Sequence, residues 1–214
     1  MKYRDYFCDI SNESFISFSD TSYLALERII SDRDLIIDML NNVLCDDTLI
    51  EKSECYDFLD KIICYSNDCD GVHMRISLFN HKYANRIHYH RWNYTASVLT
   101  GSYTQYMYGT CNEDDITVLA PYDPIFIEKY RPNNIYSLEH TVVHSVKAEP
   151  DTISVCIRGK AFGDKFQTVD PKTNTSWWQY GSQLEAREER VMKSVSLDYL
   201  RMKVNHLISV LSLK

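Results

Sequence analysis

Apolar positions along the chain follow three successive patterns, and the first of these is helical. Up to about residue 65, hydrophobic side chains recur three and four positions apart. They form two groups: Leu35, Ile36, Ile37, Met39, Leu40 and Leu44, and then Leu49, Ile50, Phe58, Leu59, Ile62 and Ile63. A capping box of Ser31 and Asp34 precedes the first group. These features predict a helical N-terminal extension over residues 1–70, which ends at the turn-forming residues from Asn67 to Gly71.

The second pattern, over residues 72–169, is a series of short β-prone runs separated by turns. The runs are VHMRISLF, RIHYHRWNYTASVLTG, SYTQYMYG, DITVLA, NIYSLEHTVVHSV and DTISVCIRG. Several short strands at this spacing, without long helical patterns between them, predict a β-sandwich or a β-barrel.

The third pattern, over residues 177–214, begins polar and charged and closes with an amphipathic helix. The apolar face of this helix comprises Leu197, Leu200, Val204, Leu207, Ile208 and Leu211. We expect the helix to dock on the barrel, with Trp177 and Trp178 as a hydrophobic anchor. A chain of 214 residues with 44% hydrophobic residues is consistent with a single domain made of these three parts.

Composition and charge narrow the functional classes. The net charge of −7 offers no basic surface for nucleic acid or for an anionic membrane. No apolar run reaches the roughly 18 residues of a transmembrane span, and the N-terminus lacks the pattern of a signal peptide. The seven cysteines are odd in number and include no CxxC pair, which indicates reduced thiols. The sequence therefore predicts a cytoplasmic protein that binds neither nucleic acid nor membrane.

Four of the seven histidines fall in two clusters within the β-prone segment. His88 and His90 lie two positions apart, so on one strand they share a face; His140 and His144 share a face in the same way. A third histidine opposite the first pair completes a three-nitrogen metal site with open coordination positions. Imidazole binds iron, zinc, copper and nickel alike, so the ligand type does not identify the metal.

The run from Arg86 to Trp92, RIHYHRW, followed by the turn residue Gly101, resembles the first motif of the cupins. The stretch that ends in His144 resembles their second motif, and the stretch from Thr152 to Gly159 resembles the strand after it. This resemblance covers residues 72–169. It implies a mainly β fold, a cupin-type double-stranded β-helix or jelly-roll barrel, with N-terminal helices and a C-terminal helix added to it.

Two departures from the common cupin pattern refine what the resemblance implies. The glutamate expected four residues after the second histidine is Tyr94 here, which is similar to the three-histidine thiol dioxygenases, as is the 54-residue interval from His90 to His144. Those enzymes carry Ser, His and Tyr at alternate positions of the strand after the third ligand. This chain has Ser154, Cys156 and Arg158 there. Thiol oxidation therefore does not carry over directly, because the catalytic tyrosine of that strand is missing.

By motif position the metal ligands are His88, His90 and His144, and His140 is the alternative third ligand. If His144 binds the metal, His140 becomes a supporting or substrate-facing residue. The candidate substrate-binding residues are Arg158, His140, Arg86, Tyr103 and Trp92. The arginines, including Arg75, offer a fork for a carboxylate or phosphate but are equally typical of a strand surface. The aromatic residues are as typical of a barrel core, and His73, His81 and His206 are interpreted as structural or exposed.

The resemblance implies a non-haem oxygenase that depends on iron(II), Fe²⁺, and acts with dioxygen on a small polar, carboxylate-bearing metabolite. Zinc, nickel, copper and manganese are the other candidate metals. One alternative is a metal-independent sugar-nucleotide isomerase or epimerase with a histidine base and a tyrosine acid. Another is a non-catalytic cupin that binds a small ligand. Open sheet edges and apolar terminal helices favour a homodimer.

Overall fold

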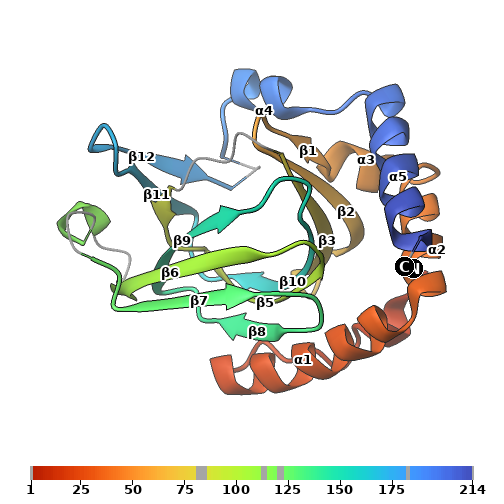
Figure 1. The fold of residues 1–214 in the computed structure, drawn as a ribbon, viewed down its shortest axis with the longest axis horizontal. Helices are drawn as coiled ribbons and strands as arrows, with labels where there is room; N and C mark the ends of the chain where they lie inside the picture. The colour runs from red at the N-terminus through yellow and green to blue at the C-terminus, as the bar shows by residue number, and fades with distance from the viewer. Residues whose placement is uncertain (1, 81–85, 112–114, 120–122, 182–183, 214) are drawn as a thin grey trace.

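Two six-stranded antiparallel sheets face each other in the computed structural model, which describes residues 2–80, 86–111, 115–119, 123–181 and 184–213 (Figure 1). The first sheet has the order β1 (Glu54–Cys55), β2 (Leu59–Asn67), β3 (Val72–Phe79), β10 (Ile153–Ala161), β5 (Trp92–Thr100) and β8 (Ile135–Leu138). The second has the order β12 (Thr175–Tyr180), β11 (Lys165–Asp170), β4 (Ile87–His88), β9 (Val142–Ala148), β6 (Tyr103–Thr110) and β7 (Phe126–Tyr130). His81 lies outside the described residues.

The strands from β3 to β10 form a jelly roll. They occupy the order β3-β10-β5-β8 in the first sheet and β4-β9-β6-β7 in the second. The chain changes sheet at every step from β3 to β6 and again from β7 to β10, which is the double-sheet arrangement that cupins share. The predicted jelly roll with helices at both ends is therefore confirmed.

Helices cover the outer face of the first sheet. At the N-terminal end lie a 3₁₀ turn, Arg4–Tyr6, and the helices α1 (Phe15–Ser31), α2 (Arg33–Val43) and α3 (Asp47–Lys52). At the C-terminal end lie α4 (Arg187–Lys193) and α5 (Leu197–Ser212). A second 3₁₀ turn, Ile116–Val118, lies between β6 and β7. None of the helices in the described part of the chain has the length and apolar character needed to cross a membrane.

The start of α2 differs from the predicted capping box. Ser31 is the last residue of α1, and the N-cap of α2 is Asp32, whose carboxylate accepts a hydrogen bond of 2.9 Å from the backbone N–H of Leu35. Asp32 has extended backbone angles (φ −116°, ψ 93°), so it separates the two helices. The predicted second helix is also wrong, because α3 is short and Leu59, Ile62 and Ile63 lie in β2. Most of β2 is buried on both faces, and continuous apolar positions hide the two-residue period of a strand.

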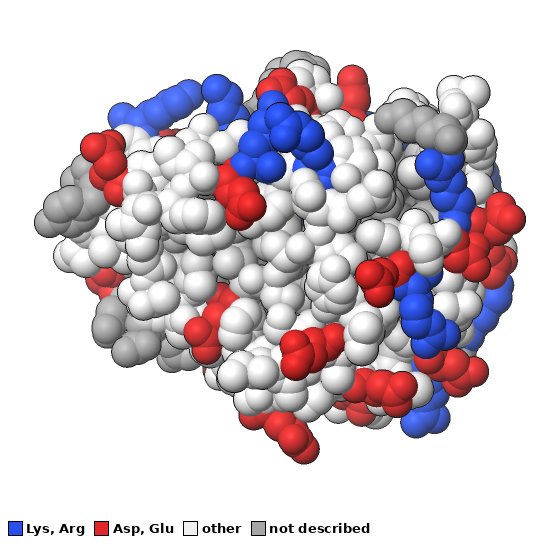
Figure 2. All heavy atoms as spheres, turned by 60° about the horizontal axis from the view of Figure 1, so that its bottom comes forward, with Lys and Arg blue, Asp and Glu red and all other residues white. Residues whose placement is uncertain are grey.

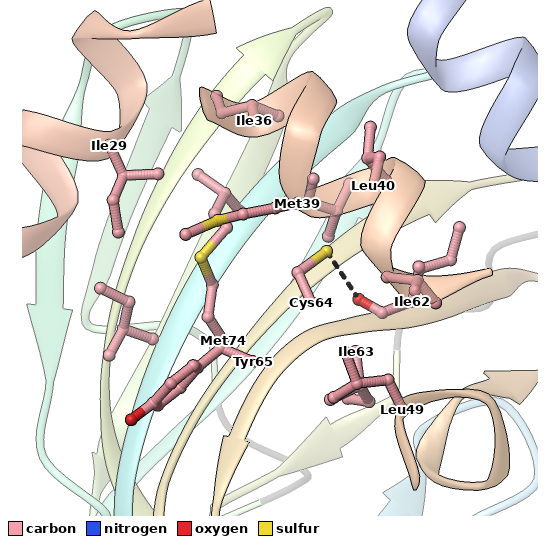
Figure 3. Packing of buried hydrophobic residues seen from close by; sticks show 14 of the residues in the cluster. Ile29, Ile36, Met39, Leu40, Leu49, Ile62, Ile63, Cys64, Tyr65 and Met74 are labelled. Carbon is pink, nitrogen blue, oxygen red and sulfur yellow. Dashed lines mark hydrogen bonds between the residues drawn. The ribbon is translucent and has the colours of Figure 1, made fainter. Parts of the chain in front are cut away.

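The main hydrophobic core lies between the helices and the first sheet. In Figure 3, Met39 and Leu40 of α2 pack over Ile62, Cys64 and Met74 of the sheet. Helix α5 adds Leu200, Val204, Leu207 and Leu211 to the same core. Trp177 and Trp178 do not anchor that helix: they lie in β12 of the second sheet, where Trp178 packs against the cluster around Ile87 and Tyr89. The predicted anchor is therefore wrong.

Candidate metal centre

Three histidine side chains converge at one end of the barrel interior. His88 in β4 pairs directly with His144 in β9, and His90 follows two residues after His88. One ring nitrogen from each of the three lies within 4.8 Å of the others. The Nε2 atoms of His90 and His144 are 3.0 Å apart. The structure thus brings together all three residues that motif position selects as ligands.

Hydrogen bonding and burial prepare these imidazoles for a metal. Nδ1 of His88 lies 3.0 Å from the backbone oxygen of Arg86. A carbonyl oxygen only accepts, so Nδ1 carries the proton and the lone pair of Nε2 is available. Burial lowers the pKa of His88 to about 4, and burial together with the neighbouring ring of His88 holds the pKa values of His90 and His144 well below their usual range. All three are therefore neutral at physiological pH, the form that binds metals.

The donor set fits a divalent transition metal. An imidazole nitrogen binds zinc at about 2.0–2.1 Å, so two ligands at a right angle lie about 3.0 Å apart, which matches His90 and His144. Without an ion, these two Nε2 atoms would have to share a single proton between them. Three nitrogens leave further coordination positions for a substrate or a gas molecule, and such a set suits iron, zinc, copper or nickel.

His140, the alternative third ligand, is held elsewhere. Its ring stacks on Phe162 with 4.3 Å between centroids, and its Nδ1 lies 3.3 Å from Oδ1 of Asn93. The same Asn93 oxygen accepts a hydrogen bond from the backbone N–H of His140. The arrangement favours His144 as the third ligand. Of the histidines interpreted as structural or exposed, His73 is buried and His206 is exposed on α5.

A stack of side chains links the histidines to Arg158. The ring of Trp92 lies parallel to that of His90, at 5.8 Å between centroids and 25°. The guanidinium of Arg158 lies 4.4 Å from the centre of the Trp92 ring, a cation–π contact. Arg158 pairs directly with Tyr94 across β10 and β5, and Tyr94 contacts His90 with ring centroids 4.9 Å apart. Residues opposite each other on paired strands share a face, so Arg158 lies on the sheet face that carries Tyr94, with its side chain partly exposed.

A second arginine lies on the same inner face and was named from the sequence only as ambiguous. Arg75 of β3 pairs directly with Cys156 of β10, and the two side chains are hydrogen-bonded. Burial, and then the charge of Arg75, lower the pKa of Arg158 to about 10. Among the described residues, no carboxylate forms an ion pair with Arg75 or Arg158, and Nε of Arg75 is buried without a partner. Both side chains are partly buried, and two guanidiniums without an ion-pair partner among the described residues suit an anion.

The remaining candidates have structural contacts. The guanidinium of Arg86 lies between the rings of Phe58 and Trp177, at 5.0 and 5.2 Å from their centres, and its backbone oxygen orients His88. The hydroxyl of Tyr103 is 2.7 Å from that of Tyr136, and its ring packs in a core cluster. Nε of Arg86 is buried and has no hydrogen-bond partner among the described residues.

Tyr94 occupies the position of the common cupin glutamate. Its ring lies between His90 and Tyr136, and it forms a hydrogen bond with Tyr136. Burial raises its pKa well above the usual range, so the phenol remains protonated. The side chain that replaces the common cupin glutamate therefore places a neutral phenol ring against His90.

Comparisons with known proteins add nothing to the fold described above. The chain matches no protein-family model and no curated protein. Similar solved structures include KdgF from Halomonas sp., at 13% identity and a TM-score of 0.37 over 49% of this chain and 82% of that one. An RmlC-like cupin from Shewanella frigidimarina has 14% identity and a TM-score of 0.39, over 51% of this chain and 84% of that one. YcfD, a ribosomal oxygenase from Escherichia coli solved with cobalt and succinic acid, has 14% identity and a TM-score of 0.33, over 42% of this chain and 23% of that one. Because these scores are low, the fold assignment rests on strand order.

Proposed function

We propose that this protein is a non-haem iron(II)-dependent oxygenase acting with dioxygen on a small, carboxylate-bearing metabolite. One observation supports this above all: three neutral imidazoles lie near two guanidiniums on the inner sheet face that have no ion-pair partner among the described residues. Nitrogen ligands with open positions suit a redox-active metal, and the guanidiniums suit an anionic substrate beside it. The other divalent metals remain candidates under the same geometry.

The chain's own residues would bind and orient the substrate. When bound, an iron(II) ion supplies open coordination positions and the redox chemistry that dioxygen requires. Arg158 binds the carboxylate, and Trp92 holds the guanidinium plane by stacking on it. Arg75 adds a second positive charge from the adjacent strand. The protonated hydroxyl of Tyr94, next to His90, is placed to donate a hydrogen bond to the substrate.

Metal analysis of protein purified without an affinity tag tests this proposal. We expect near-stoichiometric iron in the wild type and its loss in His88→Ala, His90→Ala and His144→Ala. His140→Ala is the matched control, because it removes a nearby imidazole that lies outside the three-histidine group. If the wild type holds no transition metal, or if His140→Ala loses as much metal as His144→Ala, the proposal is wrong in its centre or in its third ligand.

A second candidate function has one contact in its favour. Tyr94 lies against both His90 and His144, with ring centroids 4.9 and 6.1 Å apart. A protonated tyrosine beside neutral histidines is the acid–base pair that a metal-independent isomerase or epimerase needs. The two functions give opposite results in metal analysis, since a metal-independent isomerase would be purified without iron.

We also propose a homodimer. Ile125, Phe126 and Ile127 at the edge strand β7 are 75%, 51% and 56% exposed, and Ile16 and Leu24 of α1 are exposed as well. Figure 2, with this side turned toward the viewer, shows a broad area without charged side chains above a border of acidic ones. An apolar strand edge favours pairing with a second copy. Light scattering at micromolar concentration tests this, and a monomer would contradict it.

A further inference from the structure

Gln105 of β6 is a fully buried amide that has no hydrogen-bond partner in the part of the chain that the structure describes. Its exposure is 0%, and neither Oε1 nor Nε2 has a hydrogen-bond partner among the described residues. A side-chain amide has two donors and a carbonyl acceptor, so its isolation in a core is unfavourable. Native proteins keep such a group where a ligand or an ordered water satisfies it.

The strand register places Gln105 on the face that carries His144. In the β6–β9 pair, Met107 lies opposite His144 and Gln105 lies opposite Val146. Residues two apart on a strand share a face, so Gln105 is the diagonal neighbour of His144 inside the barrel. Diagonal neighbours are within reach of long side chains. The orphan amide therefore faces the same interior as the candidate metal centre.

The neighbours of Gln105 leave its amide for a ligand. Tyr103 and Met107, two residues to either side, pack in separate hydrophobic clusters. The hydroxyl of Tyr103 is bonded to Tyr136. A second orphan donor, Nε1 of Trp92, is buried next to His90 on the opposite sheet. The interior thus offers two arginines that can bind an anion, and separately two polar side chains that can bind an uncharged polar group of the same ligand.

The chemistry of an amide limits what this second group is. A carboxylate only accepts and would leave Oε1 unpaired, whereas an ammonium only donates and would leave Nε2 unpaired. A hydroxyl both donates and accepts, so it satisfies both ends of Gln105. We propose that Gln105 determines specificity by binding a substrate hydroxyl, and that the substrate is a small hydroxy-carboxylate. This rests on the proposed function, since the carboxylate binds Arg75 and Arg158.

Thermal unfolding of the ligand-free full chain tests whether the amide lacks a permanent partner. Gln105→Met replaces it with an apolar side chain of similar size, and we expect the melting temperature to rise by about 2–6 °C. Gln167→Met is the matched control: Gln167 is equally buried, but it accepts from the N–H of Ile116 at 2.8 Å and donates to Asp115 at 2.9 Å. This control should lower the melting temperature. If Gln105→Met also lowers it, a permanent partner such as a fixed water holds the amide and the proposal fails.

Ligand binding tests the substrate class directly. The probes are two sets of matched small acids, L-malate, succinate and L-aspartate, and L-lactate, propionate and L-alanine. In at least one set we expect the hydroxy acid to bind the iron-loaded wild type about tenfold more tightly than the other two. Gln105→Met should abolish that preference while keeping the wild-type metal content.

The outcomes separate this inference from the proposed function. The role of Gln105 would be overturned by equal binding within each set, by a preference for the amino acids, or by no binding of any of the six acids. It would also be overturned by a hydroxyl preference that survives in Gln105→Met. These results would leave the metal content of the wild type unchanged. Conversely, a wild type without metal that still loses its hydroxyl preference on Gln105→Met would overturn the oxygenase and retain the specificity residue.

Discussion

The two faces of the first sheet differ in almost every physical respect, although they alternate along the same strands. On β3 and β10 the outer face carries Met74, Ile76, Leu78, Ile153, Val155 and Ile157, all buried under the helices. The inner face of the same two strands carries His73, Arg75, Ser77, Ser154, Cys156 and Arg158. The outer face is apolar and covered by helices, while the inner face holds cations that have no ion-pair partner in the described part of the chain. We infer that the helices stabilise the fold and leave the barrel interior for ligands.

The largest expected effect is on the outer face. Leu40→Ala should lower the free energy of unfolding by about 2–5 kcal/mol, because Leu40 is fully buried between α2 and the sheet. Chemical denaturation measures this change. The metal content of the folded variant should equal that of the wild type, since no outer residue contacts the histidines. Loss of metal together with loss of stability would show that the two faces are not independent.

The second effect concerns the inner face. Arg158→Met should weaken binding of the preferred acid by about one to two powers of ten, since a charge-assisted contact contributes roughly 1.5–3 kcal/mol. Arg158→Lys should recover part of the loss, because an ammonium lacks the planar fork. Isothermal titration calorimetry measures both affinities. The comparison fails if Arg158→Met destabilises the ligand-free protein as strongly as Leu40→Ala does.

The third effect is a pH dependence that belongs to the inner face. The folded-state pKa values of His88, His90 and His144 are depressed, so these groups stay neutral while the unfolded chain binds protons below pH 6.5. The stability of the metal-free protein should therefore be fully present above pH 6.5 and fall as the pH drops toward about 4. Each neutral histidine contributes at most about 1.4 kcal/mol per pH unit.

Denaturation curves at pH 7 and pH 5 measure this slope. His144→Asn should reduce it, whereas His206→Asn, a substitution on the exposed side of α5, should leave it unchanged. A slope that is the same in all three proteins would mean that the buried histidines do not control the acid response.

The smallest effect lies again outside the barrel. Asp32→Ala removes the N-cap of α2 and should lower the free energy of unfolding by about 1 kcal/mol. Asp32→Asn is the matched variant, because its amide oxygen still accepts from the N–H of Leu35. A loss in Asp32→Asn as large as in Asp32→Ala would assign the effect to charge and not to capping.

The sequence predicted what depends on short-range spacing. His88 and His90 share a face because they lie two apart, and the turns between short β-prone runs predicted a sandwich or barrel. The resemblance to cupins, carried by the histidine motifs, specified the jelly roll. Strand β2 was missed because burial on both faces removes the alternation that marks a strand. The capping box was misplaced by one residue, since Ser31 and Asp32 are both good N-caps in sequence and only the backbone angles distinguish them.

Long-range register accounts for the rest of what was missed. Arg75 stands in an apolar run, and its position beside Arg158 depends on the pairing of β3 with β10. The sequence offered no signal for Gln105, whose relation to His144 depends on the register of β6 and β9. Trp177 and Trp178 were assigned to the helix that follows them in the chain, but they pair with β11. A residue pattern shows which side chains of one strand share a face, but their neighbours on other strands are known only once the pairing is known.

The direct pairing of β4 with β9 also has a kinetic consequence. His90 and His144 are 54 residues apart in the chain, so their approach requires the closure of a long loop and the assembly of the strands between them. We therefore expect an ion that needs all three nitrogens to bind after the rate-limiting step of folding. Its effect should fall on the unfolding rate, which decreases when the ion is present, while the refolding rate stays the same.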